Sequence, residues 1–434
     1  MAYTEKRTVG YGERVKNSFG GVITGIIMFV AGTWLLGWNE GRAVKTAEAL
    51  KEGAGVAIEM ESIKKVDPSF DGELVHATGM AETTDSLYDS QFGVGAISIN
   101  LEREVEYYQW VEHQSEQRED KLGGSEEITT TYTYSKEWVS EPQNSSNFKD
   151  PAYAGRSNAV LMQLEDQEWT AEHVTFGAYT CPASMISKIG GSEKMELSIS
   201  DEMLKAINAE IARVLGEQPI VTTPEPEVTA ADSVAVDSNK VVFNDNRYEN
   251  IHVSQNQIYL GKSPNSPAVG DVRISYTVIY PHKISIIAQV SGNTFKQYKA
   301  KNGKTLMMVH NGVVSMEEMF QSAEDTNEFW TWVLRIFGIL LVCGGLKGLF
   351  GFLETLLKVV PFLSSIFSFG VGIVTSVIGI VWSLLVIAIA WLFYRPVLAI
   401  CILVGAGVII FLIVNRGKVK AKLNEAKAKK EAEA

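Results

Sequence analysis

The sequence predicts a multi-pass α-helical membrane protein with four spans and a large extracytoplasmic domain that is rich in β-strands (α+β). Three observations predict this fold class. The run 19–38 contains no charged residue, and the last hundred residues carry most of the remaining continuous apolar sequence. Between these regions, several strand-length segments alternate apolar and polar residues. We expect the strands to form two small barrel-like halves of the OB type.

The first predicted span is 19–38. Twenty helical residues rise about 30 Å, which matches the hydrocarbon core of a bilayer. Trp34 and Trp38 lie toward its end, where aromatic rings prefer the headgroup layer, and charged residues follow at once. A cleaved signal peptide is the competing interpretation, because four basic residues precede the run. The apolar stretch is too long for one, and no small-residue cleavage pattern follows it.

Three further spans are predicted near the C-terminus, at 330–346, 367–394 and 396–414. The first of them is short and carries Arg335 near one end, and the second is long enough to cross with tilt. Only Arg395 separates the last two, which leaves room for a tight turn alone. The segment 347–366 places Lys and Glu among Leu and Phe, and this pattern predicts an interfacial or re-entrant helix.

The distribution of Lys and Arg predicts the orientation. Four lie in 1–18, two in the connection 347–366 and seven in the Lys-rich tail 415–434. Four spans put these three segments on one side, and the positive-inside rule makes that side cytoplasmic. Both termini are then cytoplasmic, and residues 39–329 lie outside the cytosol.

The outer segment divides into five predicted parts. They are a β-rich half at 56–141, a mixed helical segment at 150–217, a loop or linker at 218–239, a second β-rich half at 240–314 and a helix at 315–329. In the mixed segment, Ser200 or Asp201 can cap a helix that Gly216 ends. Ser315 and Glu318 have capping-box spacing, which predicts the start of the helix that leads into the second span.

The outer segment is strongly acidic. It holds 24 Lys and Arg against 45 Asp and Glu, a balance of −21. That field repels nucleic acid, so we expect no DNA or RNA partner. We interpret the charge as a solvated surface, with an acidic docking face as the alternative. The seven basic residues of the tail, by contrast, predict attraction to anionic membrane lipids.

No pattern in the sequence indicates an enzyme. The six histidines are scattered singly, and neither a GxSxG motif nor a phosphate-binding glycine loop occurs. We interpret His76 and His310, which fall in strand-like runs, as ordinary packed or surface histidines. Cys181 is the single cysteine of the outer segment, which excludes an internal disulfide framework there. We therefore expect no catalytic residue, no cofactor and no metal site.

Six residues are candidates for interaction: Asn39, Glu40, Gly41, Arg42, Arg335 and Arg395. Glu40 and Arg42 follow the first span directly, where they could bind a partner's charge or a lipid headgroup, or fix the angle at which the helix leaves the bilayer. Gly41 allows another backbone to come close. Arg335 is a functional candidate because it lies in a span, but a cation near a span's end also suits a snorkelling anchor. Arg395 suits a tight hairpin at the headgroups.

The chain resembles the transmembrane protein 43 family, also called LUMA. The resemblance rests on segments that occur in order over essentially the whole chain: WNEGRAVKTAEALKEG, GELVHATGMAET, EYYQWVE, YTYSKEWVSE, PAVGDVRISY, TWVLR and AWLFYRP. It implies four spans with a large lumenal or external domain. It also implies self-association and the organisation of envelope proteins, with a location in the endoplasmic reticulum or inner nuclear membrane in animal members. A bacterial inner membrane stays open as the other compartment.

Two functions follow as hypotheses. The first is a non-enzymatic membrane scaffold that forms a homo-oligomer, binds membrane lipids and organises other membrane proteins through its outer domain. The alternative is a lipid-handling or small-solute transport protein with a polar path near Arg335. Asn144 is an acceptor for N-glycosylation only in a host that glycosylates that compartment.

Overall fold

The computed structural model describes residues 3–155, 158–216, 247–359, 361–397, 400 and 404. The expected linker 218–239 and the tail 415–434 lie outside the described residues, as does most of the expected fourth span. The chain divides into two compact units. The β-rich unit comprises Met1–Arg7, Gly53–Arg118 and Ile128–Phe320, and the helical unit comprises Thr8–Glu52, Glu119–Glu127 and Gln321–Ala434.

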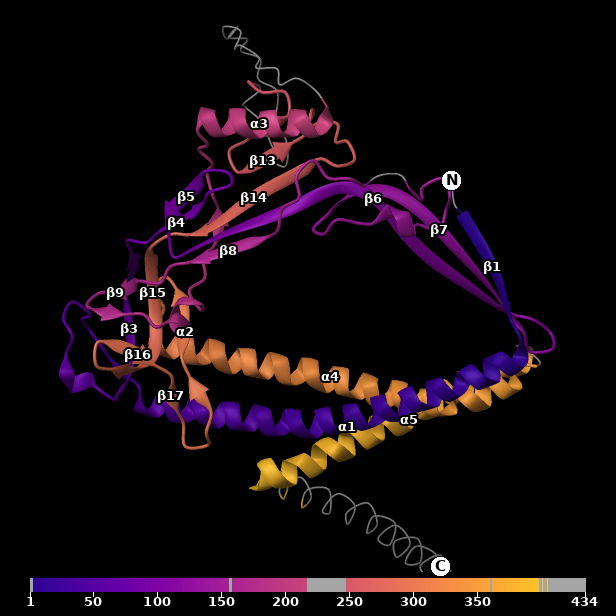
Figure 1. The fold of residues 1–434 in the computed structure, drawn as a ribbon. Helices are drawn as coiled ribbons and strands as arrows, with labels where there is room; N and C mark the ends of the chain where they lie inside the picture. The colour runs from indigo at the N-terminus through magenta and orange to yellow at the C-terminus, as the bar shows by residue number, and fades with distance from the viewer. Residues whose placement is uncertain are drawn as a thin grey trace, which may run out of the picture. The chain divides into compact units, whose positions relative to one another are not determined.

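The larger sheet has eight strands (Figure 1). Its main path, in spatial order, is β1 (Tyr3–Val9), β7 (Glu126–Val139), β6 (Asn100–Asp120), β14 (Val272–Ile279), β13 (Gln257–Leu260) and β12 (Ile251–Val253). Off this path, β8 (Gln167–Thr170) pairs with β6 and β11 (Glu193–Lys194) pairs with β14. Helix α3 (Asp201–Leu215) packs on this sheet, because its apolar stripe of Leu204, Ile207 and Ile211 is buried with the strand residue Tyr276.

The second sheet has seven strands. In spatial order they are β19 (Met308–Asn311), β15 (His282–Ser291), β16 (Thr294–Lys296), β10 (Tyr179–Thr180), β9 (Val174–Phe176), β3 (Leu74–Thr83) and β2 (Ile58–Glu59), and β15 also pairs with β3. Its hydrophobic cluster includes Ile284, Ile286 and Phe176, with the short helix α2 (Ala183–Ile186) packed on it through Met185. Two further hairpins pair β4 (Ser86–Asp89) with β5 (Val94–Ile97) and β17 (Tyr298–Lys299) with β18 (Thr305–Leu306).

Both large sheets combine strands from the two β-rich halves that the sequence predicts. β6 lies in 56–141 and pairs antiparallel with β14, and β3 pairs antiparallel with β15. Two separate barrel-like halves therefore do not describe this pairing. Periodicity determines which residues of a strand face inward, but the choice of a partner strand depends on packing between distant segments.

The predicted helix caps are present. The Ser200 hydroxyl accepts a hydrogen bond from the Met203 amide, and Gly216 ends α3 with φ +72°. At the start of α4 (Met316–Leu357), the Glu318 amide donates to the Ser315 hydroxyl, and the Ser315 amide donates to the Glu318 carboxylate. Short local patterns were sufficient for these predictions.

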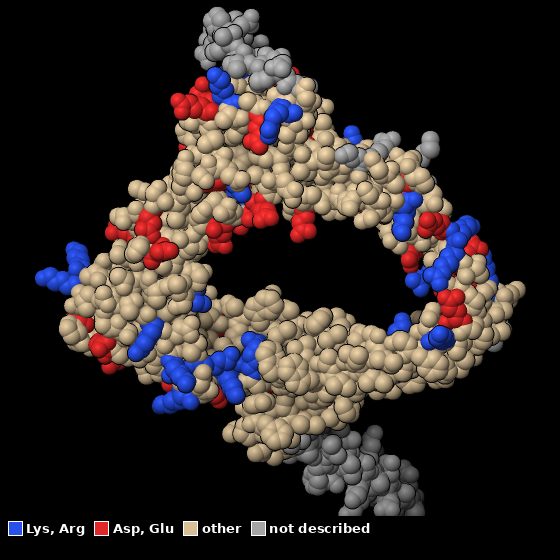
Figure 2. All heavy atoms as spheres, viewed as in Figure 1, with Lys and Arg blue, Asp and Glu red and all other residues tan. Residues whose placement is uncertain are grey.

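Within the part of the helical unit that the structure describes, three helices are long and apolar enough to cross a membrane: Tyr11–Val56 (α1), Met316–Leu357 (α4) and Ser368–Tyr394, the larger part of α5 (Pro361–Tyr394). Because α4 is continuous, the expected span 330–346 and the first half of the segment 347–366 lie on one helix, which ends before Pro361. Figure 2 shows few charged residues on the visible surface of these helices between their ends.

Glycines let α1 and α4 approach closely. A Cβ atom added to Gly345 of α4 would lie 2.5 Å from the backbone nitrogen of Phe29, and one added to Gly25 of α1 would lie 2.8 Å from the Gly345 carbonyl oxygen. Backbones this close leave no room for a side chain. The contact among the three helices has a buried apolar centre formed by Leu36, Val342 and Ile387.

The turn Glu119–Glu127 also belongs to the helical unit. Arg14, near the start of α1, reaches Asp120 at 2.6 Å and donates to the Gly124 carbonyl oxygen at 2.9 Å. Lys358 lies 3.9 Å from the same Asp120 carboxylate. The sequence places 1–18 and 39–329 on opposite sides of a bilayer, and these contacts join a residue of each range. No local pattern in the sequence indicates these contacts, because Arg14 and Gly124 lie 110 positions apart.

Candidate functional site in the helical unit

Glu40 and Arg335 are at the centre of a polar cluster that joins α1, α4 and α5. Arg335 donates through Nε and Nη2 to the two carboxylate oxygens of Glu40, at 2.6 and 2.8 Å. The indole Nε1 of Trp391 on α5 donates to Glu40 Oε2 at 2.8 Å. Glu40 is completely buried, and the Arg335 guanidinium lies 4.9 Å from the centre of the Trp332 ring. Both carboxylate oxygens of Glu40 are thus satisfied from two other helices.

Asn39 and Arg42 extend the cluster by one helical turn. The Asn39 amide donates to the Thr331 carbonyl oxygen at 3.0 Å. Arg42 donates to the side chains of Asn39, Asn327 and Thr331 at 3.2, 3.2 and 3.0 Å. Asn327 in turn donates to the Ala43 carbonyl oxygen at 3.1 Å. The signature Asn-Glu-Gly-Arg therefore binds α4 along one face of α1.

Gly41 meets α5 instead. A Cβ atom at this position would lie 2.6 Å from the ring of Tyr394, so the ring packs where a side chain would otherwise stand. The next residue, Arg395, follows the end of α5, and its backbone amide donates to the Trp391 carbonyl oxygen at 2.7 Å. All six sequence candidates therefore lie at this junction.

A cavity of about 440 Å³ lies beside the cluster between α1 and α4. Its lining residues are Ala43, Ala47, Lys51, Glu324, Asn327, Glu328, Thr331, Trp332, Arg335 and Arg395. The cavity brings Arg335 and Arg395 together, although the sequence treats them as separate anchors of separate spans. It is lined by charges of both signs and by the methyl groups of two alanines.

Sequence analysis missed three partners in the cluster: Asn327, Thr331 and Trp391. Asn327 and Thr331 are spaced by one helical turn on α4, which is a pattern that could have indicated one polar face entering an apolar run. Trp391 lies within the quoted motif AWLFYRP, where a single indole among apolar residues gives no sign of its hydrogen bond.

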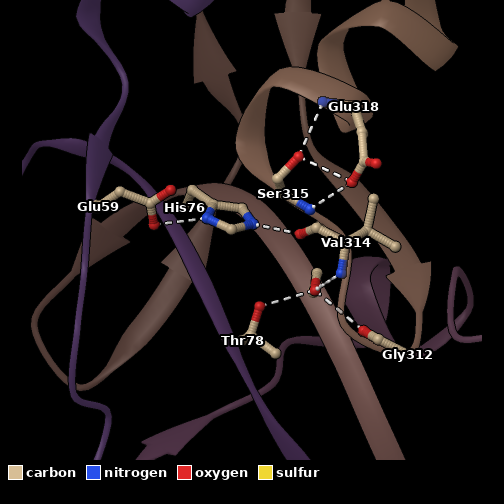
Figure 3. A network of polar contacts seen from close by, with 8 residues as sticks. Glu59, His76, Thr78, Gly312, Val314, Ser315 and Glu318 are labelled. Atoms are coloured by element: carbon tan, nitrogen blue, oxygen red, sulfur yellow. Dashed lines mark hydrogen bonds and ion pairs between the residues drawn. The ribbon is translucent and has the colours of Figure 1, made fainter.

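A second polar network lies in the β-rich unit, where the chain leaves α1 and enters α4 (Figure 3). The buried His76 ring lies between two acceptors, with Nδ1 2.6 Å from Glu59 Oε2 and Nε2 2.9 Å from the Val314 carbonyl oxygen. The Ser285 hydroxyl accepts from the Val314 amide at 2.9 Å and donates to the Gly312 carbonyl oxygen at 3.0 Å. His76 is thus a packed histidine whose hydrogen bonds connect β2 with the segment before α4.

A metal site in the part of the chain that the structure describes would need several ligand side chains that converge. There, no group of three or more His, Cys, Asp or Glu side chains is arranged to hold a metal ion. Cys181 is buried, and burial raises the pKa of its thiol to about 12, which disfavours the reactive thiolate. Its surroundings are those of a small core residue.

Comparison with known proteins confirms the family that the sequence resembles. The profile of the family Transmembrane protein 43 matches residues 107–396. Transmembrane protein 43 of Mus musculus is 31% identical over 431 residues, which cover 96% of this chain and 95% of the mouse protein. The Homo sapiens protein is 30% identical over 95% of this chain and 94% of its own length.

More distant relatives extend the likeness. The Transmembrane protein 43 homolog of Drosophila melanogaster is 26% identical over 88% of this chain and 90% of its own length. No solved structure matches the chain. Since the profile matches more than half of the chain and these mammalian relatives cover at least 95% of it, the chain belongs to the transmembrane protein 43 family.

Proposed function

We propose that the protein is a non-enzymatic membrane scaffold. Its helices anchor it, and its acidic β-rich segment self-associates and holds other membrane proteins near the membrane surface. The observation that carries this proposal is that the charged side chains of the polar cluster find their hydrogen-bond partners within the same chain. Glu40, Arg42 and Arg335 bind other helices of the same chain, so the cluster suits a rigid anchor better than a catalytic centre.

The proposed topology follows the apolar stretches. The described apolar helices and the stretch 396–414 cross the bilayer as four spans, with both termini in the cytoplasm. The membrane is then the inner membrane of a bacterium, or the endoplasmic reticulum or nuclear envelope of a eukaryote. The exposed rings of Trp38, Trp330 and Trp332 support a membrane surface at the level of the polar cluster. The contact between Arg14 and the turn Glu119–Glu127 competes with this topology, and labelling from the two sides of sealed vesicles distinguishes them.

The proposed partners follow from charge. The acidic outer segment favours protein partners over nucleic acid, and its field keeps anionic headgroups away. Membrane lipids are bound instead by the helices and the basic tail. A homo-oligomer presents several copies of the outer segment at once, which raises the effective concentration of each docking surface.

Light scattering of the full-length protein in mild detergent, with the detergent mass subtracted, tests this proposal. We expect a discrete oligomer whose mass does not change on dilution. A monomer at every protein concentration, both in detergent and in lipid nanodiscs, would overturn the self-associating scaffold.

One observation favours the alternative of a lipid-handling or small-solute transport protein, namely the cavity that Arg335 and Arg395 line. Against transport, Glu40 neutralises Arg335, and the glycine contacts close the interface between α1 and α4. Solute flux in proteoliposomes that disappears in Arg335→Ala would support transport, whereas the absence of flux in the wild type would leave only lipid binding.

A further inference from the structure

We propose that the cavity beside Arg335 binds the headgroup of a zwitterionic aminophospholipid, with the phosphate at the arginine end and the ammonium at the carboxylate end. This inference rests on the position of the polar cluster at the membrane surface that we propose above. The cavity volume of about 440 Å³ accommodates a headgroup with its ordered water.

The two walls of the cavity come from antiparallel helices. Hydrogen bonds from Asn39 to Thr331 and from Asn327 to Ala43 show that α1 and α4 run in opposite directions here. On α1, the lining residues recur at 43, 47 and 51, and on α4 at 324, 328, 331 and 335, so each set lies on one helical face. Ala43 and Ala47 are small, and their methyl side chains leave the space between the helices open.

The charges are ordered along α4. Arg335 is followed by the apolar stretch of the helix, whereas Glu324 and Glu328 lie toward its polar start. Glu328 and Arg335 are seven residues apart, which is about 10 Å along a helix. A phospholipid carries its phosphate next to the acyl chains and its ammonium farther out. The order of charges in the cavity matches that order.

Two arginines supply the phosphate end. Arg335 uses Nε and Nη2 for Glu40, which leaves Nη1 as its remaining terminal nitrogen. Arg395 is half-buried, and its guanidinium makes no hydrogen bond or ion pair with a side chain of the described residues. A half-buried cation in a cavity gains from an anion in reach of its donors.

The opposite end carries the complementary charge. Glu324 and Glu328 line the cavity together with Lys51, so one net negative charge is left for an ammonium group. Trp332 lies between the two ends, where its ring can pack against the glycerol region. The exposed apolar residues Ile336 and Leu340 continue α4 and offer a surface for an acyl chain.

Titration of the delipidated full-length protein with short-chain phospholipids, followed by native mass spectrometry, tests the proposal. The probes are phosphatidylethanolamine, phosphatidylglycerol and inorganic phosphate. We expect phosphatidylethanolamine to bind most tightly. Equal binding of phosphatidylglycerol would overturn the aminophospholipid, and a free phosphate ion that binds as tightly as the lipid would overturn the lipid as the source of the phosphate.

Variants assign the two ends. Arg395→Gln should lower the affinity for both phospholipids about tenfold, which is the effect of losing one charge-assisted hydrogen bond. Arg395→Lys should restore most of that affinity. Glu328→Gln should lower the affinity for phosphatidylethanolamine alone. Glu317→Gln, which lies on the same helix outside the cavity lining, should change the affinity for neither phospholipid. Unchanged binding in both Arg395→Gln and Glu328→Gln, with melting curves like the wild type, would remove the site.

The oligomer mass separates this proposal from the scaffold. Lipid binding that is lost in Arg395→Gln while the mass by light scattering stays unchanged supports the site independently of self-association. A wild-type protein that is monomeric but still prefers phosphatidylethanolamine would overturn the scaffold proposal and support the lipid site.

Discussion

Glu40 and Arg335 form a bidentate ion pair between α1 and α4, with both oxygens of a fully buried carboxylate bound to one guanidinium. The two residues are 295 positions apart in the sequence. In an apolar environment each charge is costly without the other, so the pair is satisfied only in one register of the two helices. The ion pair therefore specifies how α1 packs against α4.

Replacing Glu40 tests that role. Glu40→Gln should lower the stability of the protein in detergent by about 3 kcal/mol, because it leaves the Arg335 charge without its partner. Arg335→Lys should cost less but still destabilise, since an ammonium cannot make the bidentate contact. Thermal unfolding measures both, with Glu48→Gln on the exposed side of α1 as the control. Equal melting temperatures for Glu40→Gln and the control would show that the pair contributes nothing.

The glycine contact between α1 and α4 gives a second prediction. Gly345→Ala should destabilise the helical unit by about 2 kcal/mol, because the new Cβ atom would lie 2.5 Å from the Phe29 backbone, which cannot move away alone. Gly37→Ala is the matched control, since a Cβ there meets nothing within 4 Å and alanine favours the helix. Melting curves of the two variants in the same detergent should shift in opposite directions; a shared shift would contradict the close contact.

The His76 network should hold the segment before α4. His76→Ala removes the contacts to Glu59 and to the Val314 carbonyl oxygen, so amide exchange in 312–316 should become about tenfold faster. Hydrogen exchange followed by mass spectrometry reports this region directly. His173→Ala is the control, because that side chain is mostly exposed. Unchanged exchange in 312–316 would mean that Ser285 alone holds the segment.

Cys181 makes stability depend on alkaline pH. Burial raises the pKa of its thiol from 9.0 to about 12, so the folded state favours the protonated form. Its contribution to stability is complete below pH 9 and is lost as the pH rises from 9 toward 12. Denaturant titrations across this range should show a decline that is smaller in Cys181→Ala. An identical decline in the variant would assign the effect to other groups.

The turn Glu119–Glu127 allows a test of sidedness. Leu122 is 85% exposed, and Lys16 lies on α1 close to Arg14, which contacts this turn. With the three native cysteines replaced by alanine, Leu122→Cys and Lys16→Cys should react with an impermeant maleimide from the same side of sealed vesicles. Labelling after detergent permeabilisation confirms that both thiols are reactive. Reaction from opposite sides would exclude the contact in the membrane-bound protein.

Local signals in the sequence were sufficient for several elements. An uncharged run of twenty residues predicts an apolar helix, because hydropathy acts residue by residue along the chain. The caps at Ser200 and Ser315 and the stop at Gly216 follow from hydrogen bonds that span only a few residues. The order of motifs along the chain predicted the family, which the comparisons confirm.

Only the tertiary structure decided which distant residues meet. Glu40 with Arg335, β6 with β14 and Arg14 with Asp120 are pairs whose members lie far apart in the chain. The sequence by itself determined the apolar helices, the strand periodicity and six candidate residues, since each depends on neighbours along the chain. The junction of those six residues, and the cavity beside it, depend on helix packing that brings together segments with no local sign of their partners.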